Sequence, residues 1–247
     1  MAARPLPPPP TLDELTAAGP LALFLDFDGT LVEIASTPDS IAVPADLAAR
    51  LAALSARFGG ALALVSGRSI GDLERFLGAG LPIACAGSHG SEIRLADGSA
   101  LGSAPVCVPE TITAKMRDYA AAHELGLEEK PHGAALHYRS NPENGPAARD
   151  FAQSLAQEHG WIAQDGKSVV ELVASQADKG QAVRALMETA PFEGKLPVFI
   201  GDDLTDEHGF AAGKELGGFG ILVGKREPTE ASHALSGVLH VHRWLGI

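Results

Sequence analysis

An apolar segment that ends in two carboxylates constrains the fold of this chain more than any other feature. Residues 21–25 are all apolar, and Asp26 and Asp28 follow at once, ahead of Gly29. Residues two apart on a strand point to the same side, and a carboxylate is costly in a core unless it is paired, protonated or bound to a metal. We therefore expect both carboxylates at the C-terminal end of a buried strand, where open α/β sheets bind ligands. A plain strand-to-turn junction, with Asp28 and Gly29 as turn residues, is the alternative.

A second acidic segment lies far along the chain from the first. Residues 196–200 are apolar, and they are followed by Gly201-Asp202-Asp203-Leu204-Thr205-Asp206-Glu207. Carboxylates a few ångströms apart repel and raise one another's pKa. A hard divalent cation that prefers oxygen ligands, such as Mg2+, removes that conflict. The two segments together predict a magnesium site, although Asp202 or Asp203 could also cap a helix over residues 204–212.

Composition and charge narrow the range of partners. The 247 residues are 45% apolar, enough for a sizeable core, and the formal net charge is -12. That charge argues against a nucleic-acid partner, because Lys and Arg supply the affinity for phosphates there. It leaves room for a small anionic substrate in a cleft that a cation and a few basic side chains dominate. Two cysteines indicate no disulfide scaffold, so we expect a cytoplasmic protein. No apolar run is long enough to span a membrane, so we expect no membrane partner. Residues 1–10 lack the apolar stretch of a secretory signal.

The order of the expected elements predicts one α/β domain interrupted by a second domain. Apolar strands at 21–27, 61–65 and 83–86 alternate with helical segments, as in a parallel sheet that is covered on both faces. Residues 109–173 follow a different pattern, in which a helix and a hairpin occur twice and predict an antiparallel sheet. After them the first pattern returns, with strands at 196–200 and 220–223.

From this pattern we expect three parts of the chain. Residues 21–103 and 177–247 form the α/β core, with a parallel sheet. Residues 104–176 form a small α+β domain inserted into one of its loops, which a fold of this kind tolerates. Residues 1–20 form a poorly ordered lead-in, because residues 5–10 are almost all proline.

Two further side chains complete a set that could hold a phosphate. Ser66 ends the strand at 61–65, and Lys179 opens a helix. A phosphate oxygen is stabilised by a hydroxyl, an ammonium and a cation, and phosphoryl transfer depends mainly on such positioning and charge stabilisation. Taken alone, Ser66 would be a turn residue and Lys179 an exposed helix residue. Their placement beside the acidic segments favours phosphoryl transfer, with a carboxylate as a possible nucleophile.

At this point the sequence resembles a known family. Four motifs match, in order, those of the haloacid dehalogenase superfamily: Asp26-Phe27-Asp28-Gly29-Thr30, Ser66, Lys179 and Gly201-Asp202-Asp203. Within it the chain is similar to the trehalose-6-phosphate phosphatase family, through Val65-Ser66-Gly67-Arg68, Gly87-Ser88-His89-Gly90-Ser91-Glu92, Leu136-His137-Tyr138-Arg139 and the segment 201–207. The likeness spans about residues 21–245. It implies a Rossmann-like parallel-sheet core with an inserted α+β cap, or lid, domain.

The resemblance also implies a reaction. In the family's mechanism Asp26 attacks phosphorus to give an aspartyl-phosphate. Asp28 protonates the leaving sugar oxygen and then serves as the base for the water that hydrolyses the intermediate. Ser66, Gly67 and Lys179 hold the phosphate. The expected activity is Mg2+-dependent hydrolysis of trehalose 6-phosphate to trehalose and phosphate.

For the metal, the resemblance implies one Mg2+ ion between the acidic segments. Its ligands are Asp26, the backbone carbonyl of Asp28, and Asp202, directly or through water. Asp203 and Asp206 are expected to support these ligands from behind.

For the sugar, the resemblance implies contacts from the inserted domain. The expected residues share charge or hydrogen-bonding groups: Glu128, Lys130, His137, Arg139 and Glu171, with Arg68 of the core as a further contact. Ion pairs on an exposed sheet face are the alternative for the strand residues. Two other functions also stay open: a phosphatase or phosphomutase for another sugar phosphate, such as sucrose phosphate or a hexose phosphate, and a non-catalytic sugar-phosphate-binding protein.

Overall fold

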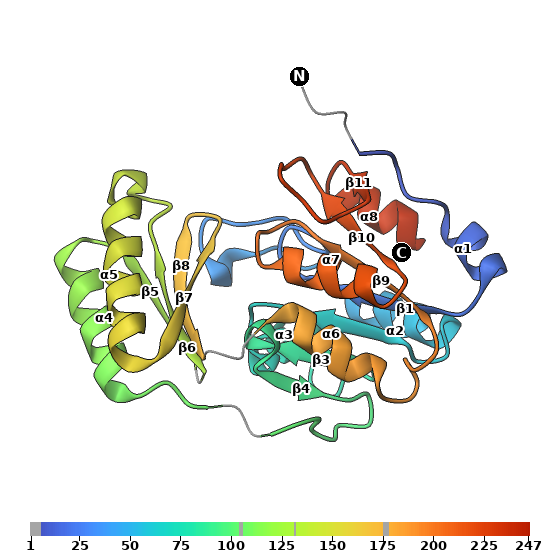
Figure 1. Ribbon diagram of the computed structural model, residues 1–247, viewed down its shortest axis with the longest axis horizontal. Coiled ribbons are helices and arrows are strands. Elements are labelled where there is room, and N and C mark those ends of the chain that lie inside the picture. Colours follow the sequence, from blue (N-terminus) through green and yellow to red (C-terminus); the bar gives the residue numbers. More distant parts are fainter. Residues whose placement is uncertain (1–5, 104–105, 131, 175–177) are drawn as a thin grey trace. The chain divides into compact units, whose positions relative to one another are not determined.

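The computed structural model of the chain describes residues 6–103, 106–130, 132–174 and 178–247 (Figure 1). The chain divides into two units. Unit 1 consists of Met1–Leu101 and Asp178–Ile247, and unit 2 consists of Gly102–Ala177.

Seven strands form the sheet of unit 1, and β1 (Leu21–Leu25) is the middle one. The strand order is β11-β10-β9-β1-β2-β3-β4, and all neighbours are parallel except β3 and β4. After β1 the chain adds β2 and β3 on one side, and it later adds β9 and β10 on the other. The strand order therefore reverses between β1 and β9, which is where open α/β sheets form a crevice. The other bounds are β2 Leu62–Val65, β3 Ala84–Gly87, β4 Glu92–Arg94, β9 Leu196–Gly201, β10 Phe219–Val223 and β11 His233–Leu235.

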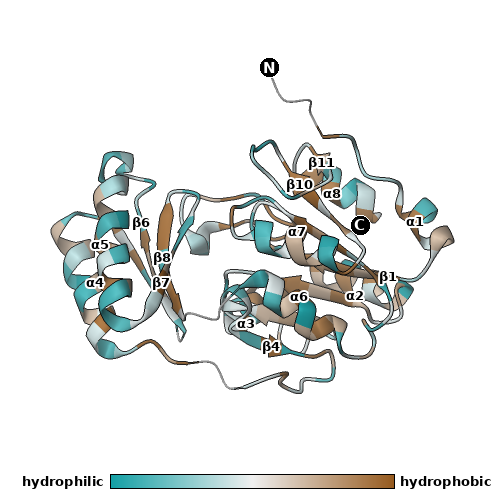
Figure 2. Ribbon diagram, viewed as in Figure 1, coloured by the Kyte–Doolittle hydropathy of each residue, from teal (hydrophilic) through white to brown (hydrophobic). Residues whose placement is uncertain are grey.

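Helices cover both faces of this sheet, because side chains of a strand alternate between its faces. Leu21, Leu23 and Leu25 join an apolar cluster with α2 (Leu47–Arg57), α3 (Ile70–Leu77) and α8 (Val238–Leu245). Ala22 and Phe24 join a second cluster with α6 (Lys179–Met187) and α7 (Asp206–Glu215). Figure 2 shows hydrophobic and hydrophilic residues alternating along α6 and α7, as expected for helices with one buried side.

The N-terminal segment differs from our expectation. Residues 11–18 are not a poorly ordered lead-in, because Thr11 caps a helix, α1 (Leu12–Ala18), in a capping box with Glu14. Leu12 and Leu15 are buried in the same cluster as the leucines of β1. Two of the prolines before the helix are held too: the carbonyl of Pro10 accepts a hydrogen bond from Trp244 Nε1 at 2.8 Å, and that of Pro7 accepts one from the N–H of Ala234 at 3.0 Å. The expectation for residues 1–5 lies outside the described residues. We expected disorder from the proline content, but an extended, proline-rich segment can still be ordered when it packs on the surface of a domain.

Unit 2 is a four-stranded antiparallel sheet with two helices. The strand order is β5-β6-β8-β7. A third apolar cluster lies in this unit. It joins alternate residues of the sheet, such as Ala134, Leu136 and Leu172, to residues of the two helices. One face of the sheet is therefore the core of this unit. The bounds are α4 Glu110–Ala122, β5 Gly126–Lys130, β6 Gly133–His137, α5 Gly145–His159, β7 Trp161–Gly166 and β8 Val169–Ala174.

The predicted α/β class with a parallel-sheet core is confirmed, and so is the antiparallel character of the middle segment. Two short elements near the end of the chain, β11 and α8, were not predicted. A strand of three residues is too short to show a period, whereas the buried Val241 and Leu245 of α8 do have the helical spacing of four, which we did not use. No helix within the described residues combines the length and apolar character that a membrane crossing requires. The cytoplasmic location stays a prediction.

The packing of α1 leads to a stability prediction. We expect Leu12→Ala to lower the free energy of unfolding by about 2 kcal/mol, because it leaves a cavity beside β1. Leu239→Ala is the control, since Leu239 is 67% exposed and should change stability by less than about 0.5 kcal/mol. Urea denaturation followed by circular dichroism measures both. Equal effects would mean that α1 does not pack on the core.

Candidate active site

Three of the predicted site residues follow three neighbouring strands of unit 1. Asp26 comes directly after β1, Ser66 after β2 and Asp202 after β9. Asp26 is tied to β9 as well, since its N–H donates to the carbonyl of Ile200 at 2.9 Å. The carboxyl ends of parallel strands meet at one edge of a sheet, so residues separated by more than 170 positions in the sequence lie together at the point where the strand order reverses.

A buried lysine links two of the carboxylates. Lys179 Nζ lies 2.8 Å from Asp26 Oδ1 and 2.6 Å from Asp206 Oδ1, and all three side chains are buried. Burial by itself lowers the pKa of Lys179, but the charges of Asp206 and Asp26 outweigh it and raise that pKa well above its usual value. Lys179 is therefore charged. Its position is fixed locally, because Asp178 caps α6 by accepting from Gly180 N at 2.6 Å.

Asp202 lies close to the strand-to-turn segment after β1. Gly29 has a φ of +80°, and a Cβ atom there would overlap the Asp202 carboxylate. Only glycine combines that backbone conformation with that close approach. One carboxylate oxygen each from Asp26, Asp202 and Asp206 lies within 4.8 Å of the others. The glycine after the two aspartates thus has a clear role, which is to let the two acidic segments meet.

These carboxylates suit a divalent cation. Burial and the charge of Asp206 raise the pKa of Asp26 well above its usual value; Lys179 opposes this and Asp202 adds to it. One ammonium cannot balance three carboxylates, and a bound cation would favour their charged forms. All the available donors are oxygens, the ligands that hard divalent ions take. The site therefore fits a divalent metal ion, to which Asp26, Asp202 and Asp206 can each offer an oxygen.

Asp28 and Arg68 form a pair that we did not predict. Arg68 Nε and Nη2 lie 2.6 and 2.8 Å from the two carboxylate oxygens of Asp28, and Nη2 also donates to the carbonyl of Pro38 at 2.8 Å. The Arg68 side chain is buried, and its guanidinium lies 4.9 Å from the ring centroid of Phe76. We expected Arg68 to contact the sugar, and the structure shows that it has a bidentate partner within unit 1. Two parallel hydrogen bonds fix the relative orientation of the two side chains and also strengthen the ion pair.

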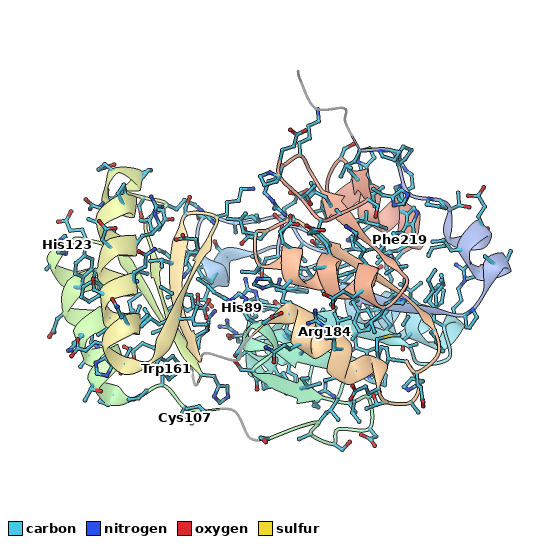
Figure 3. The ribbon with its side chains drawn as sticks, in the orientation of Figure 1. His89, Cys107, His123, Trp161, Arg184 and Phe219 are labelled. Atoms are coloured by element: carbon cyan, nitrogen blue, oxygen red, sulfur yellow. The ribbon has the colours of Figure 1, made fainter. Side chains whose placement is uncertain are left out.

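The loop after β3 shapes the surroundings of Ser66. The N–H of His89 donates to the Ser66 carbonyl at 3.0 Å, and the N–H of Arg68 donates to Ser66 Oγ at 3.1 Å. His89 has a φ of 56° and is buried (labelled in Figure 3). A Cβ atom at Gly67 would lie 2.7 Å from His89 Cε1. Gly67 therefore lets the histidine ring pack directly against the backbone that follows Ser66.

Neither Asp202 nor Asp203 is the N-cap of a helix. The N-cap of α7 is Thr205, so the capping alternative for Asp202 and Asp203 is wrong. Asp203 accepts from the N–H of Leu204 at 2.7 Å, and its own N–H donates to Asp206 Oδ2 at 2.8 Å. Asp206 thus holds both Lys179 and the backbone of the acidic segment.

In unit 2 the predicted sugar residues share one face of the sheet. Glu128 of β5 lies opposite Ala135 of β6, and Ala135 lies opposite Glu171 of β8, so the three side chains are on the same face. Lys130 Nζ lies 2.9 and 3.0 Å from the two carboxylate oxygens of Glu171, and His137 Nε2 lies 2.8 Å from Glu128 Oε2. This face is opposite the one that packs on α4 and α5, because neighbouring residues alternate.

The charges on that face depend on one another. Burial raises the pKa of Glu128, but the hydrogen bond with His137 and the charge of Lys130 outweigh it, so the net shift is downward. Gly133 leaves space between the strands, since a Cβ atom there would lie 3.1 Å from Glu171 Oε1. Arg139 follows β6 and donates to the carbonyl of Lys167 at 3.3 Å. The structure therefore brings together Glu128, Lys130, His137 and Glu171.

Comparison with known proteins gives the chain a family. The family described as Trehalose-phosphatase matches residues 24–238. A trehalose-6-phosphate phosphatase of Escherichia coli is 40% identical over 227 residues, which cover 91% of this chain and 85% of that protein. A probable trehalose-phosphate phosphatase of Sinorhizobium fredii is 39% identical over 92% of this chain and 85% of that protein.

Solved structures agree in fold. The C-terminal domain of a C. albicans trehalose-6-phosphate phosphatase covers 100% of this chain and 98% of its own, with a TM-score of 0.82 and 21% identity. A haloacid dehalogenase-like hydrolase from Bacteroides thetaiotaomicron covers 92% of this chain and 98% of its own, with a TM-score of 0.64 and 15% identity. The resemblance that we inferred from the motifs is confirmed, and the chain belongs to the trehalose-phosphatase family.

Proposed function

We propose that this chain hydrolyses trehalose 6-phosphate to trehalose and phosphate. The observation that carries the proposal is the cluster of buried Asp26, Lys179 and Asp206 with the partly exposed Asp202 at the switch point of the sheet, in a chain 40% identical to an enzyme named for this substrate. A carboxylate beside a buried cation and a metal-binding group is suited to attack on a phosphate ester.

Asp26 is the nucleophile in this proposal. Its carboxylate forms a bond to phosphorus while the bond from phosphorus to the sugar oxygen breaks. Asp28 gives its proton to that oxygen, so that trehalose leaves as an alcohol. Water then attacks the phosphorus of the aspartyl-phosphate, Asp28 takes the proton from the water, and Asp26 is released with free phosphate.

Lys179, Ser66 and Gly67 hold the phosphate. Lys179 offers a charged ammonium whose position two carboxylates fix. Ser66 offers a hydroxyl and Gly67 a backbone N–H at the end of β2. Such prearranged donors stabilise the charge that develops on the phosphoryl oxygens.

The metal in the proposal is Mg2+. Asp26, Asp202 and the carbonyl of Asp28 would hold it, with Asp203 and Asp206 behind them. When bound, it neutralises charge on the phosphate and on Asp26. Arg68 is paired with Asp28 through a bidentate contact, and its contact with the sugar stays a prediction.

Unit 2 supplies the sugar specificity in this proposal, as a cap domain of about residues 104–176. Its polar face carries Glu128, Lys130, His137 and Glu171, and we keep Arg139 as a further candidate. A disaccharide presents many hydroxyl groups, and a site built from charged donors and acceptors discriminates strongly against substrates that lack them.

A panel of substrates tests the function. Purified protein with Mg2+ should release phosphate from trehalose 6-phosphate much faster than from sucrose 6-phosphate or glucose 6-phosphate. A chelator should abolish the release, and Asp26→Asn should lower it by several orders of magnitude, because the amide is not a nucleophile. Preference for another sugar phosphate would reject trehalose 6-phosphate as the substrate, and full turnover by Asp26→Asn would reject the mechanism.

Gly29 tests the meeting of the two acidic segments. We expect Gly29→Ala to lower kcat/KM by about 100-fold or more, because displacement of a reacting or metal-binding group by about 1 Å has that effect. Gly98→Ala is a matched control: Gly98 has a φ of +88°, but nothing lies within 4 Å of a Cβ atom there. It should carry the same backbone strain and keep its activity. If both variants were equally impaired, strain alone would explain the loss.

Glu128 tests the sugar face. We expect Glu128→Gln to raise KM for trehalose 6-phosphate about tenfold or more, since a hydrogen bond with a charged partner contributes about 1.5–3 kcal/mol. KM for a small aryl phosphate should not change. Glu129→Gln is the control, because Glu129 lies on the same strand, on the opposite face, and pairs with Arg117 at 2.8 Å. Equal effects on both substrates would remove Glu128 from the sugar site.

A further inference from the structure

Arg226 lies outside every motif of the sequence, yet it contacts the backbone of a proposed metal ligand. It follows β10, and β10 pairs in parallel with β9 through Leu222 and Gly201. The residues that follow the two strands therefore leave the sheet at the same edge. Arg226 Nη1 donates to the carbonyl of Asp202 at 2.6 Å.

The peptide unit between Asp202 and Asp203 is held at both of its polar groups. Arg226 binds its carbonyl, and the N–H of Asp203 donates to Asp206 Oδ2 at 2.8 Å. A peptide unit is planar, so two opposed hydrogen bonds fix the orientation of the whole plane. That plane sets the backbone direction at Asp202, and so the position from which its carboxylate projects beside Gly29.

Glu207 holds Arg226 in turn. Arg226 Nη2 is paired with Glu207 Oε1, and the N–H of Glu230 donates to Glu207 Oε2 at 2.6 Å. Both charged side chains are only 19% exposed, so solvent screens the pair less than it would a surface pair. The guanidinium also brings one positive charge to a segment that has four carboxylates between positions 202 and 207.

We propose that Arg226 and Glu207 are positioning residues for the metal site: together they hold Asp202 in the orientation that binds the divalent cation. The inference rests on the proposed metal site. It assigns neither residue to the substrate or to the reacting atoms. Residues that orient a metal ligand from behind commonly change metal affinity by about 10- to 100-fold when they are replaced.

The test measures Mg2+ binding without substrate, as the rise in unfolding temperature with Mg2+ concentration. For Arg226→Met we expect an apparent Kd about 10- to 100-fold above that of the unaltered protein. Arg226→Lys keeps the charge but cannot make both contacts of the guanidinium. Its Kd for Mg2+ should lie between that of the unaltered protein and that of Arg226→Met. Glu207→Gln should weaken binding like Arg226→Met, since it removes the charge that anchors Arg226.

Arg184→Met is the matched control (Arg184 is labelled in Figure 3). Arg184 also pairs with a glutamate of α7, Glu215, at 2.7 Å, but on the exposed surface. Its Kd for Mg2+ should not change. A folded Arg226→Met protein with unchanged Mg2+ affinity would overturn the proposal, and so would an equal shift in Arg184→Met. If Arg226→Met does not fold, Arg226→Lys and Glu207→Gln decide in the same way. An unaltered protein that binds Mg2+ but does not release phosphate would reject the proposed function alone.

Discussion

The contact of Lys179 with Asp26 and Asp206 is the interaction on which the rest of the site depends. Burying a carboxylate without a partner costs several kcal/mol, and this site buries two of them beside the partly exposed Asp202. The ammonium makes that possible and is itself kept charged by them. Because Lys179 begins α6 and Asp26 follows β1, the same contact also joins the two sequence segments that form unit 1.

The sheet topology explains why so many acidic groups can meet. The strand order reverses between β1 and β9, so the two chain segments diverge from a common edge. Two side chains there approach the backbone so closely that only glycine fits at the contact. Gly29 admits the Asp202 carboxylate, and Gly67 admits the His89 ring. Backbone freedom at these two glycines and charge at the aspartates are thus parts of one arrangement.

Much of the fold and of this site could be predicted from the sequence. Asp26, Ser66 and Asp202 were found because each ends an apolar run, and the topology of a parallel sheet brings such ends together. The pairing of Arg68 with Asp28 was missed, since the two residues are 40 positions apart and no local pattern reveals it. Arg226 was missed for the same reason.

The alternation of side chains along β5 has a consequence for how this family can diversify. Glu128 and Lys130 point to the polar face, whereas Leu127 packs on the core of unit 2 and Glu129 pairs with Arg117 of α4. Evolution can exchange every second residue of this strand to accommodate a new ligand without disturbing the hydrophobic interior. Insertion or loss of a single residue would instead turn both faces over at once. Diversity among relatives should therefore accumulate here through replacements and not through changes in strand length.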